Sequence, residues 1–128
     1  PRSTLFPYTT LFRSPIARLP GSTIARIPDP VHGESAVTHY RLLSYQSGTD
    51  TSLLEIRLET GRTHQIRVHM KYIGHPLYGD FLYNPDYRFL NRQSLHSWKL
   101  SFLHPVTRDP MEFTADIPED MQQFFHCT

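Results

Sequence analysis

The sequence predicts an α+β fold, built on a mainly antiparallel β-sheet with a few helices. Two regions, near 36–59 and 96–116, each contain a pair of segments in which polar and apolar residues alternate, as in a β-hairpin with one buried face. Between them, at about 63–73, the apolar residues recur with the period of a helix. Hairpins arranged around a helix in this order favour the α+β class.

The composition indicates one globular domain. The 128 residues are 38% hydrophobic and 12% aromatic, which is enough to bury a core. No apolar run approaches the roughly 18 residues of a membrane span, and no secretory signal opens the chain. Cys127 is the only cysteine, so no internal disulfide can form and a reducing, cytoplasmic location is expected. The formal net charge of +1 indicates no particular partner.

The first fourteen residues, PRSTLFPYTTLFRS, look foreign to the rest of the chain. The triplet TLF occurs at 4–6 and again at 10–12, and the apolar residues around it are compatible with a buried strand. However, TLFPYTTLFRS resembles the translation of a common sequencing-library adapter. We therefore interpret residues 1–14 as an assembly artefact, set them aside from the fold, and expect that native sequence upstream of residue 15 is missing.

The first hairpin is predicted from the segments that follow. Residues 15–35 hold four prolines and two glycines and indicate a loop with short extended pieces. Residues 36–45 are rich in β-branched and aromatic side chains, and a turn at 46–51 leads to a second strand at 52–59. The side chains expected to face the core from that second strand are Leu54, Ile56 and Leu58.

A helix is predicted over about 63–73. Thr63 is a plausible N-cap, Gly74 suits the position after the last helical residue, and Pro76 cannot continue the helix. The apolar stripe of this helix consists of Ile66, Met70 and Ile73.

The rest of the chain predicts a second hairpin and a short final helix. Residues 75–94 are aromatic and turn-rich without a clear period, and the helix is expected to begin after Pro118. The side chains expected to face inward in this hairpin are His96, Trp98, Leu100, Phe102, Met111, Phe113 and Ala115.

The stretch TGRTHQIRVHM, residues 60–70, places His64 and His69 close together in sequence. Five residues correspond to about 140° around a helix and to opposite faces of a strand, so the two rings do not converge on one metal ion. His69 lies beside the apolar stripe, where a hydrogen-bonded core histidine is the expected role, and His96 is interpreted in the same way. No metal site is predicted.

The cations of the same stretch form a basic edge on the predicted helix. With Ile66 at 0°, Arg67 falls near about 100°, Lys71 near about 140° and His64 near about 160°. Arg62 stands just before the helix, where free N–H groups favour an anion. A phosphate polymer or a buried carboxylate would suit this edge, and a plain solvated face is the alternative.

The segment LLEIRLETGRTHQIRVHMKYIGHPLYGD (53–80), followed by SLHSWKLSFLHPVTRDPMEFTADIPEDM (94–121), resembles the C-terminal motif of RluA-type pseudouridine synthases. The resemblance extends over roughly residues 15–124. It implies that residues 15–128 are the C-terminal portion of such a catalytic domain. The implied activity is the isomerisation of selected uridines in structured RNA, ribosomal or transfer RNA, by a cytoplasmic, monomeric enzyme without metal, organic cofactor or membrane attachment.

The resemblance also implies roles for individual residues. The family's catalytic group is an aspartate in an HRLD-type motif, and this motif is absent from the chain. By position, Arg67 is the arginine that pairs with the aspartate, whereas Asp80 is a structural turn residue. The resemblance implies, less directly, that Arg62, His64 and Lys71 support the site or contact RNA. We therefore expect an active parent enzyme and an inactive fragment, the alternative being an RNA-binding domain of the same fold without catalysis.

Overall fold

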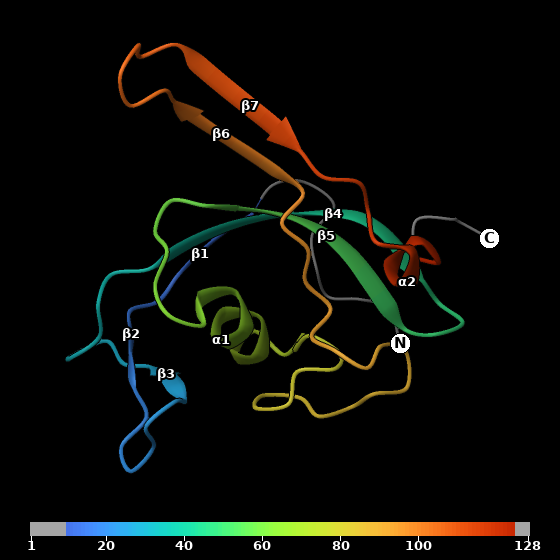
Figure 1. Ribbon diagram of the computed structural model, residues 1–128. Helices are drawn as coiled ribbons and strands as arrows, with labels where there is room; N and C mark the ends of the chain where they lie inside the picture. Colours follow the sequence, from blue (N-terminus) through green and yellow to red (C-terminus); the bar gives the residue numbers. More distant parts are fainter. Residues whose placement is uncertain (1–9, 125–128) are drawn as a thin grey trace.

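The computed structural model describes residues 10–124, which form three small antiparallel sheets and two helices (Figure 1). This arrangement confirms the predicted α+β class. The loop expected at 15–35 contains two short strands, in agreement with the prediction of short extended pieces. The elements in chain order are β1 Thr10–Arg13, β2 Ile16–Arg18, β3 Arg26–Pro28, β4 Val37–Gln46, β5 Thr51–Leu58, α1 Gln65–Tyr72, β6 Lys99–Leu103, β7 Pro110–Thr114 and α2 Glu119–Gln122.

The main sheet has the strand order β1-β4-β5. Strands β4 and β5 form the first predicted hairpin, paired from Thr38 opposite Leu58 to Gln46 opposite Thr51. The predicted inward face of β5 is confirmed for two of its three residues, which pack against the core, but Leu58 at the end of the strand is 43% exposed. Within the described residues, no strand pairs with the outer edge of β5.

Strand β1 lies in the segment that the sequence argument set aside. It pairs with β4 from Thr10 opposite Tyr40 to Arg13 opposite Val37. The ring of Phe12 packs against the core and meets the ring of His69 edge-on, with centroids 4.8 Å apart. Setting residues 1–14 aside therefore missed one strand. The adapter origin of the segment stays a prediction, and residues 1–9 lie outside the described residues.

Helix α1 covers one face of the main sheet (Figure 1) and contributes Val68 and Met70 to the buried core. Met70 packs with Tyr40 of β4, and Val68 packs with Ile16 and Ala36. The predicted stripe is confirmed, since the other two stripe residues, Ile66 and Ile73, are half-buried against the same cluster as Met70. Neither described helix has the length and apolar character needed to cross a membrane.

The two ends of α1 are formed differently from each other. His64, rather than the expected Thr63, is the N-cap residue; its backbone is left-handed, with φ 58°, and its side chain makes no capping bond. At the other end, Gly74 has φ 90°, and the amides of Gly74 and His75 donate to the carbonyls of Lys71 and Met70 at 3.0 and 2.8 Å. These bonds make a Schellman motif, which confirms the predicted role of Gly74.

The second hairpin forms as predicted, but its side chains do not face a core. Strands β6 and β7 pair from Lys99 opposite Thr114 to Leu103 opposite Pro110, and the hairpin projects away from the main sheet (Figure 1). Trp98 is 45% exposed and Phe113 is 53% exposed. The prediction of an inward face was wrong here. The other residues assigned to that face are also at least partly exposed: His96, Leu100, Phe102, Met111 and Ala115.

Two smaller predictions concern the C-terminal part of the chain. Helix α2 begins directly after Pro118, as expected. His96 precedes β6 and is only half-buried, with its Nε2 atom 3.2 Å from the carbonyl oxygen of Ala115. The expectation of a core histidine was therefore wrong for His96, although the ring does have a hydrogen-bond partner.

The expectation of a core histidine is confirmed for His69, which is completely buried. Its Nε2 atom lies 2.8 Å from the carbonyl oxygen of Ser14, and its Nδ1 atom lies 2.8 Å from Thr38 Oγ1. A carbonyl only accepts, so Nε2 carries the proton. Thr38 Oγ1 accepts a hydrogen bond from Gln65 Nε2 at 3.0 Å, and its hydroxyl can donate to Nδ1. The chain of bonds therefore fits a neutral imidazole.

This arrangement predicts a loss of stability at mildly acidic pH. Burial lowers the pKa of His69, and burial followed by the charges of Arg67 and Arg26 lowers the pKa of His64. The unfolded chain then binds more protons than the native protein, so stability falls as the pH drops below about 6.5. Urea denaturation should give a lower free energy of unfolding at about pH 5.5 than at about pH 7.5.

The variant His69→Gln tests the assignment. Although it is expected to be less stable than the parent at neutral pH, its stability should change less between the two pH values. Equal stability of the parent at both values would show that the native histidines titrate normally.

Candidate functional site

The site is centred on a buried ion pair between Arg67 of α1 and Asp80. Arg67 Nε donates to Asp80 Oδ2 and Arg67 Nη2 donates to Asp80 Oδ1, both at 2.8 Å. The side chain of Arg67 is 11% exposed and that of Asp80 is fully buried. The bidentate geometry fixes the plane of the guanidinium. From the sequence, Asp80 was expected only as a structural turn residue, and the carboxylate partner of Arg67 was expected to lie outside this chain; in the structure Asp80 itself pairs with Arg67.

Asp80 also holds the turn that presents it. Its Oδ1 atom accepts hydrogen bonds from the amides of Leu82 and Tyr83, at 3.0 and 3.2 Å. Burial alone would raise the pKa of Asp80, but the hydrogen bonds from Arg67 and from these two amides outweigh it and hold the pKa below its usual value. Hydrogen bonding between Arg67 and Asp80 in turn raises the pKa of Arg67. Both groups are therefore charged at neutral pH.

Gly79 allows the backbone to deliver Asp80 to this position. Its φ is 74°, and a Cβ atom added to it would lie 2.0 Å from the carbonyl oxygen of Arg92. The substitution Gly79→Ala is expected to lower the free energy of unfolding by about 3 kcal/mol or more, because a strained φ is combined with a clash against backbone. Thermal denaturation is the measurement. Gly61→Ala is the matched control, since nothing lies within 4 Å of a Cβ there, and a similar loss in both variants would contradict this account.

Two aromatic rings flank the guanidinium. Its carbon lies 5.5 Å from the ring centroid of Phe81 and 5.1 Å from that of Tyr83. The Lys71 ammonium lies 5.8 Å from the same Tyr83 ring. The Tyr83 hydroxyl accepts a hydrogen bond from the backbone amide of Arg26 at 2.8 Å and lies 2.8 Å from His64 Nδ1. Tyr83 thus contacts groups from two other parts of the chain, β3 and the segment of α1 with its N-cap residue.

The four basic residues singled out in the sequence are not equivalent in the structure. His64, Arg67 and Lys71 surround Tyr83, as their shared edge predicted. Arg62 is engaged elsewhere: its Nε atom donates to the carbonyl of Ser35 at 2.7 Å, and its Nη1 atom lies 3.1 Å from Glu34 Oε2. Because the pKa of His64 is lowered, its ring is neutral at pH 7 and contributes hydrogen bonding, so most of the positive charge around Tyr83 comes from Arg67 and Lys71.

The loop before α1 is fixed by Gln65, which is 3% exposed. Its Oε1 atom accepts from the Thr60 hydroxyl and from the Arg62 amide, at 2.8 and 2.9 Å. Its Nε2 atom donates to the Val37 carbonyl at 3.0 Å. These bonds anchor the segment TGRTHQ to β4, and they set the position from which α1 carries Arg67 toward Asp80.

Sequence reasoning missed three residues of this site, namely Gln65, Phe81 and Tyr83. The two aromatic residues lie in the segment 75–94, which has no helical or strand period to assign their faces. The signal that could have found them is that both aromatic residues lie within three positions of an aspartate, Asp80, in a segment otherwise without pattern.

A separate cleft of about 1060 Å³ lies beside β5, and Met70, Leu77, Leu90 and Met121 are among its lining residues. It contains neither member of the Arg67–Asp80 pair, so the charged site and this cleft are different features.

Among residues 10–124, no three histidine, cysteine, aspartate or glutamate side chains are grouped so that they could hold a metal ion. The site's chemistry is that of a fixed cation with aromatic neighbours: Arg67 Nη1 makes no hydrogen bond to the described residues and can donate to a second anionic group.

Comparison with known proteins points to one class of enzyme. The family described as RNA pseudouridylate synthase matches residues 23–72. The RNA pseudouridine synthase YjbO of Bacillus subtilis is 48% identical over 110 residues, covering 86% of this chain and 38% of its own length. An RNA pseudouridine synthase of Chloroflexus aurantiacus is 46% identical, covering 91% and 36% respectively.

A third relative has a more specific name. The ribosomal large subunit pseudouridine synthase D of Zymomonas mobilis is 44% identical over an alignment of 102 positions, and the match covers 73% of this chain and 32% of that protein. The chain therefore spans only about a third of the length of these curated relatives.

Proposed function

This chain belongs to the RluA-type RNA pseudouridine synthases, and from that premise we propose that the whole protein isomerises uridine to pseudouridine in ribosomal or transfer RNA. The reaction breaks the bond between the ribose and uracil N1, turns the uracil, and joins the ribose to uracil C5. We further propose that the enzyme acts in the cytoplasm as a monomer. The observation that carries the proposal is the Arg67 guanidinium, which is held rigidly and still has donors to offer a second carboxylate.

We propose that Arg67 orients the catalytic aspartate, and that this aspartate belongs to sequence upstream of residue 15. Asp80 binds one edge of the guanidinium through two hydrogen bonds, and the rings of Phe81 and Tyr83 lie beside it. The Nη1 group faces away from Asp80 and is suited to bind an incoming carboxylate, keeping it ionised. Without that aspartate the chain is expected to be inactive.

We propose RNA-facing roles for the surrounding basic residues. Lys71 is exposed on the helix and forms no ion pair with the described residues, so it supports a phosphate contact. Arg62 supports a weaker contact, since Glu34 partly neutralises its charge. His64, which is neutral at pH 7, is suited to hold Tyr83 in place or to hydrogen-bond a ribose or base.

The proposal is tested by comparing two proteins, the 128-residue chain and a longer form that includes the native upstream sequence. Both are incubated with ribosomal and transfer RNA labelled with tritium at uracil C5, because joining C5 to the ribose displaces that hydrogen. Release of tritium is expected from the longer form alone. Release by the 128-residue chain would contradict the proposed location of the aspartate. No release by the longer form, despite RNA binding, would favour an RNA-binding domain without catalysis.

A further inference from the structure

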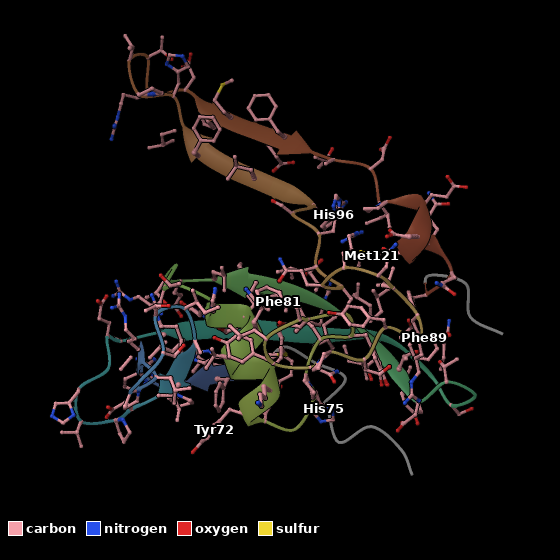
Figure 2. The ribbon with its side chains drawn as sticks, turned by 60° about the horizontal axis from the view of Figure 1, so that its bottom comes forward. Tyr72, His75, Phe81, Phe89, His96 and Met121 are labelled. Atoms are coloured by element: carbon pink, nitrogen blue, oxygen red, sulfur yellow. The ribbon has the colours of Figure 1, made fainter. Side chains whose placement is uncertain are left out.

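Phe81 is an exposed aromatic side chain in a basic environment. It follows the buried Asp80 directly, and its side chain is largely in solvent, with the residue 65% exposed. Figure 2 shows Phe81 on the α1 side of the molecule. The Arg67 guanidinium lies 5.5 Å from its ring centroid. The ring is thus held beside a cation and still presents surface for a ligand.

The charges around Phe81 favour an anionic ligand. Arg67 contacts both Phe81 and Tyr83, and the Lys71 ammonium lies over Tyr83, so the three side chains Phe81, Arg67 and Lys71 border one patch. The carboxylate of the patch, Asp80, is fully buried and paired with Arg67. No exposed carboxylate pairs with Lys71 among the described residues. Negative charge on a ligand is therefore not repelled here.

We infer that Phe81 is a stacking surface for an unpaired RNA base whose phosphate lies against Lys71. An aromatic ring beside cations is the combination that binds single-stranded nucleic acid, since the ring stacks on a base and the cation neutralises the backbone. The inference rests on the proposed function, because isomerising a uracil requires nucleotides that have left the helical stack. It adds a contact for the base itself to the phosphate contacts proposed above.

The chain offers a matched control for Phe81. Tyr72 is 66% exposed, almost the same fraction as Phe81. The Tyr72 ring contacts Phe12 of β1, with centroids 6.3 Å apart. It is therefore an equally exposed aromatic residue whose ring packs toward β1.

The experiment measures binding of the 128-residue chain by fluorescence anisotropy, at several salt concentrations, to two labelled probes. One probe is a single-stranded oligouridylate of about twelve nucleotides, and the other is a ribose-phosphate oligomer of the same length without bases. Phe81→Ala is expected to weaken oligouridylate binding at least about fivefold without changing the salt dependence. Phe81→Tyr should restore binding, and Tyr72→Ala should leave it unchanged.

The two probes separate stacking from a structural effect. The wild-type chain should bind the baseless oligomer more weakly than oligouridylate, and Phe81→Ala should cause no further loss there. Lys71→Ala should instead weaken both probes and reduce the salt slope by about 0.7. Circular dichroism confirms that each variant is folded.

Each remaining outcome overturns a stated claim. Equal losses on both probes, or a similar loss from Tyr72→Ala, would overturn the stacking role of Phe81. Binding that depends on Lys71 but not on Phe81 would overturn the stacking role and leave the proposed RNA contact intact. If the wild-type chain binds neither probe at low salt, both the stacking role and the RNA-facing role of this surface are overturned. Tritium release by the longer form tests catalysis independently of these results.

Discussion

Replacing Asp80 with asparagine is expected to lower the free energy of unfolding by about 3–5 kcal/mol. The carboxylate is fully buried and the Arg67 side chain is only 11% exposed, so the substitution leaves a desolvated guanidinium without its counter-ion. The turn also loses strength, because the charged oxygen that accepts the Leu82 and Tyr83 amides becomes neutral. Urea denaturation at pH 7 measures the loss.

The control for this prediction is Asp86→Asn. Asp86 pairs with Arg88 at 2.9 Å, but that pair lies at the surface, where water screens the charges and little stability is at stake. The double variant Arg67→Met/Asp80→Asn should be more stable than Asp80→Asn alone, since it leaves no buried charge unpaired. If Asp80→Asn lowers the free energy of unfolding no more than Asp86→Asn does, the buried ion pair does not stabilise the site.

The second large effect concerns catalysis in the longer form of the protein. Arg67→Lys is expected to reduce pseudouridine formation at least about 100-fold, because lysine keeps the charge but cannot hold two carboxylates in fixed geometry. The retained charge still compensates Asp80, so the variant should remain folded. RNA affinity should change little. Tritium release measures the activity, and a binding assay with the same RNA measures the affinity.

Arg88→Lys is the matched control for this variant. Arg88 is an exposed arginine whose carboxylate partner, Asp86, lies two residues away, and replacing it should leave turnover unchanged. Turnover that survives Arg67→Lys would show that Arg67 is not the partner of the catalytic aspartate. A joint loss of turnover and thermal stability would instead point to a structural role.

Those parts of the fold that follow from local periodicity were predictable from the sequence. The alternation along β4 and β5 and the stripe of α1 each arise because one face of the element is buried. Gly74 could be assigned to the position after the last helical residue because the backbone there is left-handed, a conformation that glycine adopts more readily than other residues. The α+β class followed from the order of these elements alone.

The site could be predicted only in part, because its contacts join residues far apart in the chain. The basic edge was visible, since His64, Arg67 and Lys71 share a helix or its first turn. Tyr83, which gathers them, bonds to the amide of Arg26, 57 residues away. Likewise, Asp80 lies in a segment without periodicity, so nothing local indicated that it would turn inward to Arg67.

The two errors about β1 and the second hairpin have a common physical origin. A strand pattern shows that alternate residues can be buried, but what covers them depends on the rest of the molecule. Phe12 packs against His69 although its segment looks foreign, whereas Phe113 is 53% exposed although its segment resembles the family in sequence. Alternation in sequence therefore predicts the strand more reliably than it predicts the burial.

The β6–β7 hairpin has a consequence for the way the molecule opens. Two paired strands without a packed face depend on their own hydrogen bonds and on contacts within the hairpin, such as the stacked rings of Phe102 and Phe113. Such a unit opens at lower free energy than a sheet that is packed against a helix. Its amide hydrogens should therefore exchange with solvent by local opening, while those of β4 and α1 exchange only when the whole protein unfolds. The hairpin and the sheet are thus expected to open as two cooperative units within one chain.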